Sequence, residues 1–359
     1  MKIAIIGAGA SGLMLATLLE KNKIEYDIYN KGKVGRKILA SGNGKCNISN
    51  INISPSYYHN NSLTKKIIND EKEALFNYLK ELEIYTKVDD EGRMYPISES
   101  SQSILNILLK NIKRPIFDEE VKHITKVSNK YKINDNNKLY DKIVISTGSI
   151  ANMNKPYYSY EYINDLNIKF NKFIPSLVGF KTKMNLKPIS GVRLKCMASL
   201  ITNNKTIHEE NGEFIFKDDG ISGICIMNLS SYFNDFTFKN SYIKLSLDVS
   251  KYNSLESVLP PKLFEYVLKN KIDISNFIIP ISGLYDMVYA QVCKGGIDIN
   301  ELNDNLSLKK DNNIFAQGEV IDVDGTCGGF NLSFAFMCAL KIAGELIWFM
   351  KLQILKCHH

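Results

Sequence analysis

The sequence predicts an α/β protein built around a Rossmann-type sheet, and three observations carry this prediction. A short apolar run, a glycine-rich turn, a helix-like run and a second strand follow one another at residues 2–6, 7–12, 13–20 and 26–29. Two later apolar runs, 142–146 and 313–316, also end in turns that contain glycine. Strand-like stretches lie between these two runs. A strand–turn–helix–strand unit of this kind is typical of parallel sheets covered by helices.

The first turn reads GAGASG, a GxGxxG pattern that follows a strand and opens a helix. Gly7 allows the tight turn, Gly9 lets the backbone approach a pyrophosphate, and Gly12 permits close packing of helix on strand. Amide groups at the start of the helix, at Ala10 and Ser11, favour anionic phosphates. The pattern therefore predicts a dinucleotide site. The alternative is a glycine-rich turn that serves packing only.

The second strand lacks the acid that usually ends it and binds the ribose hydroxyls of the adenosine. It ends Ile28-Tyr29-Asn30. Asn30 could accept one hydrogen bond from a ribose, without charge assistance. Asp27 is the nearest acid, but the alternation of side chains along a strand leaves its direction open.

The two later turns contain Thr147-Gly148 and Gly318-Glu319. Either turn alone is ordinary, but their order behind GxGxxG suits proteins that bind FAD across several strand ends. The sequence holds one GxGxxG only. We therefore expect FAD, bound without covalent attachment, and NAD(P)H as a transient reductant with no site of its own.

Composition limits the classes of partner. The formal net charge is +7, but nearly all of the positive charge is lysine, with arginine only at positions 36, 93, 114 and 193. No basic run is interleaved with aromatic residues, so nucleic-acid contact stays open. Seven cysteines without a CxxC pair, and five histidines, predict neither a disulfide framework nor a metal site.

A long apolar run at 331–350 is interrupted by Lys341 and Glu345. A buried helix explains this run better than a membrane span. Together with the cysteine pattern, it predicts a cytoplasmic protein that contacts no membrane. The sequence indicates neither the oligomeric state nor whether His358 and His359 are native.

Residues 35–50, GRKILASGNGKCNISN, are too polar and too rich in glycine for a helix or strand of any length. Arg36 and Lys37 offer two cations for phosphate oxygens. The stretch 41–47 offers backbone N–H groups where larger side chains would collide with a ring. The alternative is a solvated loop with a buried Cys46.

This stretch resembles the GRK-SGGGRCN-TN signature of the YhiN/BaiN-like bacterial flavoproteins, often labelled aminoacetone oxidase family FAD-binding enzymes. GEVIDVDGTCGGFNLSFA at 318–335 resembles the GEV-D--G--GGYN signature of the same family. Three further stretches follow the family order: GRMYPISESSQSI, DDGISG and KGGIDINEL. The departures are Asn43, Lys45 and Phe330 within the signatures, Asn30 at the missing acid, Ser149 where glycine is usual, and the stretch after Ser149, which lacks the family's glycine-rich form.

The resemblance covers almost the whole chain and implies a Rossmann-type FAD domain of the two-dinucleotide-binding kind, with an inserted β-rich domain and a small helical cap. The FAD domain would comprise residues 1–175 and 300–359. The β-rich domain would occupy 176–248 and return at 286–299, and the cap would occupy 249–285.

Motifs and resemblance together give one set of expected cofactor-binding residues: Gly7, Gly9, Ala10, Ser11, Gly12, Asn30, Lys31, Arg36, Lys37, Ser41, Gly42, Asn43, Gly44, Cys46, Asn47, Val121, Thr147, Gly148, Gly318, Glu319, Asp322, Gly328, Gly329, Phe330, Asn331 and Leu332. Within this set, Glu319 is expected to accept a ribitol or ribose hydroxyl, with Asp322 as its rival. A helix that starts near Gly328-Gly329-Phe330 would direct N–H groups at the pyrimidine edge of the flavin.

Tyr95, Cys46 and Cys327 are candidate proton donors, although ordinary packing explains each of them equally well, so the catalytic residue stays unassigned. The leading hypothesis is an NAD(P)H-dependent, FAD-dependent reductase of a polarised C=C bond in a small molecule. One alternative is an amine oxidase of the aminoacetone type that produces hydrogen peroxide, and another is a protein in which FAD is structural.

A further alternative is reduction of uridine to dihydrouridine in ribosomal RNA, to which members of the resembling family are linked. It would require lysines of the β-rich domain and cap around the flavin and a stacking aromatic at its opening, for which Tyr95, Tyr157 and Tyr158 are the candidates.

Overall fold

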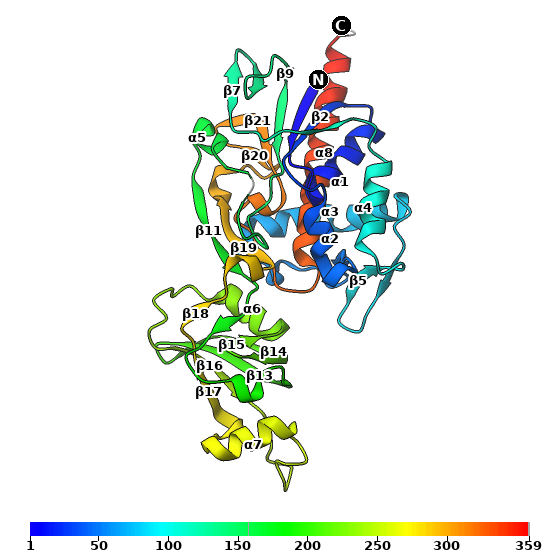
Figure 1. Ribbon diagram of the computed structural model, residues 1–359. Helices are drawn as coiled ribbons and strands as arrows, with labels where there is room; N and C mark the ends of the chain where they lie inside the picture. The colour runs from blue at the N-terminus through cyan, green and yellow to red at the C-terminus, as the bar shows by residue number, and fades with distance from the viewer. Residues whose placement is uncertain (157, 358–359) are drawn as a thin grey trace. The chain divides into compact units, whose positions relative to one another are not determined.

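The structure is a computed structural model that describes residues 1–156 and 158–357, so Tyr157 lies outside the described residues. The chain divides into two compact units. Unit 1 comprises residues 1–150, 155–173 and 294 onward, and unit 2 comprises 151–154 and 174–293. The chain passes between the units along β11 (Phe170–Ser176) and β19 (Val292–Ile297), which pair with each other (Figure 1).

Unit 1 is built on a six-stranded sheet in the order β20-β21-β10-β1-β2-β6. Its strands are β1 (Lys2–Ile6), β2 (Glu25–Asn30), β6 (Ile116–Asp118), β10 (Lys142–Ile145), β20 (Ser307–Leu308) and β21 (Asp311–Ala316). All neighbours pair in parallel except β20, which is antiparallel to β21. The predicted α/β fold is therefore confirmed, and the strand before each of the three glycine turns belongs to this one sheet.

Tyr26 and Tyr29 of β2, which point to opposite faces of this sheet, show what covers each face. The Tyr26 hydroxyl donates to Glu20 of α1 (Ala10–Lys21), 2.7 Å away. Tyr29 points the other way, toward Tyr140 in a three-stranded meander of β7 (Ile124–Val127), β8 (Lys130–Ile133) and β9 (Leu139–Tyr140). Helices thus pack on one face and the meander on the other.

The helical face is closed by the last helix of the chain. Helix α8 (Phe330–Cys357) packs against α1 and α3 (Asn61–Glu81), as Figure 1 shows. By length and composition, residues 330–351 would also suffice to cross a membrane. Phe334, Phe336 and Ile342 are nevertheless buried in the core of unit 1, as expected for a buried helix.

Smaller elements complete unit 1. They are α2 (Arg36–Ala40), the 3-10 turns η1 (Ser41–Gly44) and η7 (Gly318–Val320), β3 (Ser49–Asn50), β4 (Thr86–Val88), β5 (Arg93–Pro96), α4 (Ser101–Lys110) and α5 (Tyr162–Leu166). Strands β3, β5 and β4 form a separate sheet. One turn of helix, α2, is not what the composition of residues 35–50 predicts; it forms because Gly35 takes a left-handed conformation and Ile38 is fully buried.

Unit 2 is a seven-stranded antiparallel sheet in the order β17-β16-β13-β14-β15-β12-β18. Its elements are β12 (Phe180–Lys181), β13 (Arg193–Thr202), β14 (Lys205–Lys217), β15 (Gly220–Ser222), α6 (Ile224–Tyr232), β16 (Ser241–Ser246), α7 (Pro261–Asn270), β17 (Phe277–Pro280) and β18 (Gly283–Leu284). Within residues 249–285, where the cap is expected, α7 begins at the Pro260-Pro261 pair, a usual place for proline. Strands β17 and β18 also lie within this range, but they belong to the sheet of unit 2, because β17 pairs with β16 and β18 pairs with β12.

Candidate cofactor-binding site

The three glycines of the first turn meet different surroundings. A Cβ on Gly7, whose φ is +110°, would lie 2.4 Å from the Ser146 carbonyl oxygen, and one on Gly12 would lie 2.0 Å from that of Gly7. Both glycines are therefore needed by the fold itself. A Cβ on Gly9 would find its nearest atom, the Ser146 oxygen, at 3.9 Å. The open space over Gly9, at the start of α1, fits the close approach of a phosphate.

The stretch 35–50 lies directly against this turn. The Gly35 amide donates to the Ala8 carbonyl at 2.9 Å, and Arg36 begins α2 immediately behind it. The Ser41 hydroxyl donates to the Ile38 carbonyl at 2.7 Å, so it serves the turn itself. Over Gly44 a Cβ would meet nothing within 4 Å. The backbone at Gly44 is therefore open to a ligand.

The two signature segments contact each other although 278 positions separate Asn50 from Gly328. Asn47 accepts from the Gly329 amide at 3.1 Å and donates to the Ser49 carbonyl at 2.9 Å. The side-chain amide of Asn50 donates to the Gly328 carbonyl at 3.1 Å. A Cβ on Gly329 would lie 2.4 Å from the Ser49 carbonyl oxygen, so only glycine allows this approach.

The start of α8 is held by its own side chains. Asn331 accepts from the Gly325 amide at 2.8 Å and donates to the Gly325 carbonyl at 2.7 Å, which closes the loop 325–331. The ring of Phe330 stacks on Tyr57 at 4.2 Å, and Leu332 is half-buried against the core. These expected cofactor residues fix the loop; any contact with the flavin would come from their backbone.

Glu319 and Asp322, the rival acids, differ in their surroundings. Both carboxylate oxygens of Asp322 accept hydrogen bonds within the protein. One accepts from the backbone amide of Gly295 and the other from the side-chain amide of Asn171, each at 2.8 Å. Glu319 pairs with Lys37 and accepts from the Ser149 hydroxyl at 2.8 Å, and Lys37 also donates to Ser149 at 2.8 Å. Asp322 therefore braces the backbone, and both oxygens of Glu319 are engaged as well, so these contacts do not separate the two acids as partners of a ribitol hydroxyl.

The cluster of Lys37, Ser149 and Glu319 joins three of the sequence motifs. Lys37 comes from the GRK segment, Ser149 follows the Thr147-Gly148 turn, and Glu319 lies in η7. Ser149, where the family usually has glycine, is the residue that bridges the other two. Gly148 itself has φ +68° and open space where a Cβ would stand.

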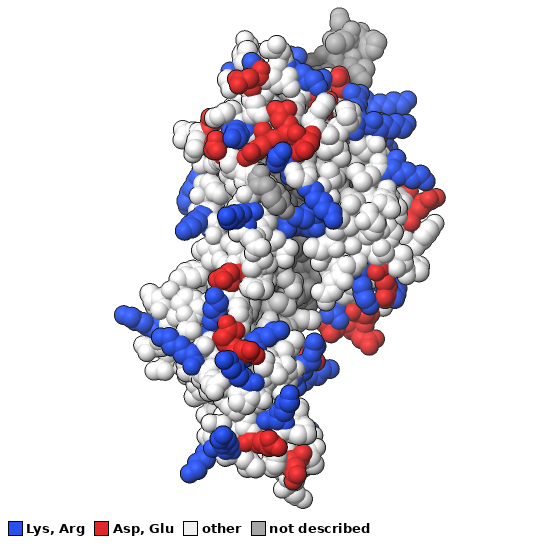
Figure 2. Space-filling model, in the orientation of Figure 1, with Lys and Arg blue, Asp and Glu red and all other residues white. Residues whose placement is uncertain are grey.

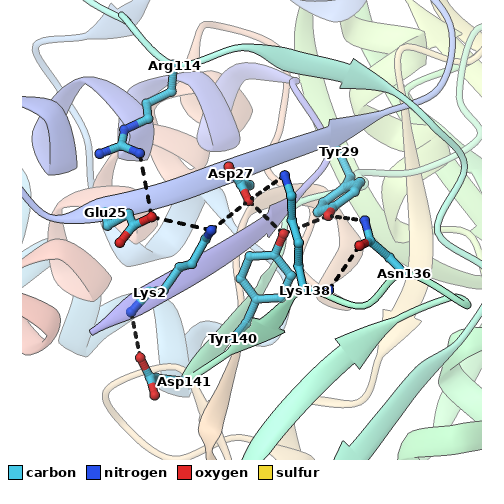
Figure 3. Close-up of polar contacts among 9 residues, drawn as sticks. All are labelled: Lys2, Glu25, Asp27, Tyr29, Arg114, Asn136, Lys138, Tyr140 and Asp141. Atoms are coloured by element: carbon cyan, nitrogen blue, oxygen red, sulfur yellow. Dashed lines mark hydrogen bonds and ion pairs between the residues drawn. The ribbon is translucent and has the colours of Figure 1, made fainter.

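Asp27 is excluded as a ribose ligand by its direction (Figure 3). Its carboxylate accepts from the Tyr140 hydroxyl at 2.7 Å and pairs with Lys2 at 3.4 Å and Lys138 at 3.3 Å, under the meander. Tyr140 in turn hydrogen-bonds Tyr29 at 2.6 Å. The hydrogen bond from Tyr140 and the nearby ammonium groups lower the pKa of Asp27 although its burial opposes this, so the side chain is a structural anion.

Asn30 is also engaged within the protein. Its Oδ1 accepts from the Ala8 amide and its Nδ2 donates to the Gly32 carbonyl, both at 2.9 Å. The side chain therefore fastens the glycine turn to the end of β2. Asn30 leaves a ribose only the second lone pair of an uncharged oxygen.

A pocket that is open to solvent lies beside Asn30. It is lined by Ile6, Gly7, Tyr29, Asn30, Lys31, Glu119, Glu120, Val121, Thr147, Tyr158 and Ser159. Five of these residues are expected cofactor ligands: Gly7, Asn30, Lys31, Val121 and Thr147. The pocket thus lies at the strand ends where an adenosine is expected. Sequence reasoning missed Glu119 and Glu120, for which the only signal is their position just after β6 and before Val121.

The candidate proton donors are not alike. Cys46 is fully buried, and burial raises the pKa of its thiol to about 11, which favours a packing role. Tyr95 is half-buried, with its ring 3.3 Å from where a Cβ on Gly42 would stand, and burial raises the pKa of its phenol. Cys327 lies half-buried in the loop before α8. Of the three, Tyr95 and Cys327 retain access to a ligand at the 41–47 turn or the 325–331 loop.

Curated proteins of similar length align with nearly the whole chain. A 3-dehydro-bile acid delta(4,6)-reductase of Clostridium scindens is 24% identical, over 93% of this chain and 96% of its own length. Ribosomal RNA dihydrouridine synthases of Haemophilus influenzae and Escherichia coli are 24% and 25% identical, over 95% and 96% of this chain and 98% and 97% of theirs.

The model of the HI0933-like protein Rossmann domain matches residues 1–345, a span that contains both glycine-rich signatures and the open turn over Gly9. The chain therefore belongs to this family of YhiN/BaiN-like flavoproteins, as the two signatures predict, and is an FAD-dependent oxidoreductase.

Proposed function

We propose that the protein reduces a polarised C=C bond of a small molecule, with NAD(P)H as the source of hydride. Three relatives aligned over more than nine-tenths of the chain support this proposal, because their names describe one kind of reaction. A delta(4,6)-reductase and a dihydrouridine synthase both add two hydrogens across a carbon–carbon double bond. This shared chemistry is the observation on which the proposal rests.

We further propose which residues hold FAD. The backbone over Gly9 and the first turn of α1 would take the pyrophosphate, together with Arg36. Glu319, oriented by Lys37 and Ser149, would accept a ribitol hydroxyl. The 41–47 turn and the 325–331 loop, joined through Asn47 and Gly329, would form the wall beside the ring system.

When bound, FAD would accept hydride from the nicotinamide and deliver it to one carbon of the substrate. The protein's own part is to orient the two molecules and to supply a proton to the other carbon. Tyr95 is the better candidate for that proton, since it is half-buried beside Gly42 of the 41–47 turn. Cys46 is fully buried and far less suited to reach a substrate.

Stopped-flow mixing in the absence of oxygen tests the proposal. NADH or NADPH should bleach the flavin absorbance at about the rate of turnover, and a 3-oxo-4,6-diene steroid or another conjugated enone should restore it. Tyr95→Phe should slow the restoration by about a hundredfold and leave the bleaching unchanged, because proton donation contributes roughly 10²–10⁴-fold. Bleaching by neither nicotinamide would refute the proposal.

Ribosomal RNA is the second candidate substrate, favoured by the names of two relatives. The net charge of +7 is compatible with it, but on the face seen in Figure 2 basic and acidic side chains are interspersed in both units. RNA that restores the flavin absorbance, with binding that weakens steeply with salt, would favour this candidate. Hydrogen peroxide formed steadily from aminoacetone would instead favour an amine oxidase.

A further inference from the structure

We infer that Glu119 supplies the carboxylate that recognises the ribose of FAD, in place of the acid missing from the end of β2. The inference rests on the proposed placement of FAD and concerns the adenosine half alone. Adjacent 2′ and 3′ hydroxyls are two donors, and an ionised carboxylate offers two acceptor oxygens at one point. Asn30 is a weaker substitute, because it offers one neutral acceptor oxygen, which already accepts from the Ala8 amide.

Glu119 occupies the neighbouring strand end. Strand β6 pairs in parallel with β2, Asp118 beside Asn30, and the Glu119 amide donates to the Asn30 carbonyl at 3.0 Å. The carboxyl ends of parallel strands meet at one edge of a sheet, where dinucleotides bind. A residue one strand further along can therefore present a carboxylate to the same space, and Glu119 lines the pocket that contains Asn30.

The position of Glu119 is fixed by one side chain of the meander. Asn134 donates to Glu119 Oε1 at 2.7 Å and to the Glu120 carbonyl at 2.9 Å. It also accepts from the amides of Lys122 and His123, at 2.8 and 3.1 Å. The side-chain amide of Asn134 thus makes four hydrogen bonds, two donated and two accepted, which hold the segment that follows β6. The carboxylate is oriented before any ligand binds, which lowers the entropic cost of recognition.

The neighbouring acids are engaged elsewhere. Glu120 lines the same pocket, but its Oε1 accepts from the Ser159 amide at 2.7 Å and it lies one residue closer to Val121. Asp118 is 76% exposed and pairs with Lys31 at 3.4 Å. Asp118 is therefore a matched control, since it carries the same charge one residue from Glu119 but does not line the pocket.

Titration of the apoprotein with FAD, followed by flavin fluorescence, tests the inference. Glu119→Gln keeps the acceptor for Asn134 and removes the charge, so we expect FAD to bind about ten- to a hundredfold more weakly, as loss of a charge-assisted hydrogen bond predicts. Asp118→Asn should bind FAD like the parent protein. Equal FAD affinity of the Gln variant and the parent would overturn the inference.

A second measurement separates ribose recognition from a general loss of affinity. ADP and 2′,3′-dideoxy-ADP are compared as competitors of FAD. The parent protein should prefer ADP by about tenfold or more, and Glu119→Gln should bind the two alike. A preference that survives in the variant overturns the inference. Loss of FAD in Gly9→Val, measured alongside, shows whether the cofactor site itself is correctly placed, and neither measurement involves the reductase reaction.

Discussion

Substitution of Gly9 separates the needs of the fold from those of the cofactor. The residue has φ −84° and ψ −164°, an extended conformation that any amino acid adopts. The nearest atom to an added Cβ is 3.9 Å away, which is ordinary van der Waals contact. Gly9→Ala should therefore leave the apoprotein folded. Its stability should even rise by about 0.4–1 kcal/mol, because alanine restricts the unfolded chain.

The effect on FAD should be opposite in sign. The space over Gly9 is where the pyrophosphate is expected, and a valine side chain there would keep the phosphates from the amides of α1. Loss of two charge-assisted hydrogen bonds at about 1.5 kcal/mol each, the lower end of their range, amounts to about 3 kcal/mol, or roughly a hundredfold in affinity. We expect Gly9→Val to weaken FAD binding by at least this factor, and Gly9→Ala by less.

Fluorescence titration of the apoprotein measures the affinity, and thermal unfolding without FAD measures the stability. Gly12→Ala is the control, since its Cβ would lie 2.0 Å from the Gly7 carbonyl oxygen and must displace backbone. It should lose about 1–3 kcal/mol of stability together with FAD binding. Undiminished FAD affinity in Gly9→Val would refute the placement of the pyrophosphate.

Three further predictions concern single side chains. Arg36→Ala should weaken FAD binding about ten- to a hundredfold and leave the thermal unfolding of the apoprotein unchanged. Lys33 is an exposed cation three residues earlier, so Lys33→Ala should leave the affinity for FAD unchanged. Equal effects of the two substitutions would contradict a phosphate contact by Arg36. Glu319→Gln should lower stability by about 1–2 kcal/mol, measured by urea unfolding, because it leaves the half-buried Lys37 ammonium without its anion; an unchanged midpoint would mean that the pair contributes nothing. Burial raises the pKa of the Cys46 thiol from its ordinary value of 9.0 to about 11, so between pH 9 and pH 11 the unfolded chain holds fewer protons than the folded protein. The free energy of unfolding should therefore fall as the pH rises through this range. Cys46→Ala should make this decline shallower, and an equal decline in the variant would assign it to other groups.

The sequence predicted those features that depend on neighbouring residues. The first strand–helix–strand unit and the strands before the two later turns follow from local periodicity and glycine placement, and all of them lie in one sheet. A buried last helix followed from the apolar run at 331–350, although α8 extends to Cys357. The helical turn α2 was missed, because a single turn is decided by the burial of one residue, Ile38, rather than by composition.

Contacts between distant segments could not be predicted. The direction of Asp27 depends on the packing of Tyr140 from the meander, 113 positions away. The grouping of Lys37, Ser149 and Glu319 depends on three loops that converge only in the folded sheet. Glu119 enters the pocket for the same reason, since the pairing of β6 with β2 brings it beside Asn30.

The order of strands in unit 1 also has a consequence for synthesis on the ribosome. Strand β10 pairs with β21 in the register Ile143↔Ile314, and α8 covers α1, which is made long before it. At about 5–20 residues per second, roughly 10–30 s separate the emergence of these two strands. During that interval the edge of β10 and the apolar side of α1 stay uncovered in the nascent chain. Such surfaces are the ones that chaperones bind, so depletion of a ribosome-associated chaperone should lower the yield of this protein more than that of a protein with a contiguous sheet.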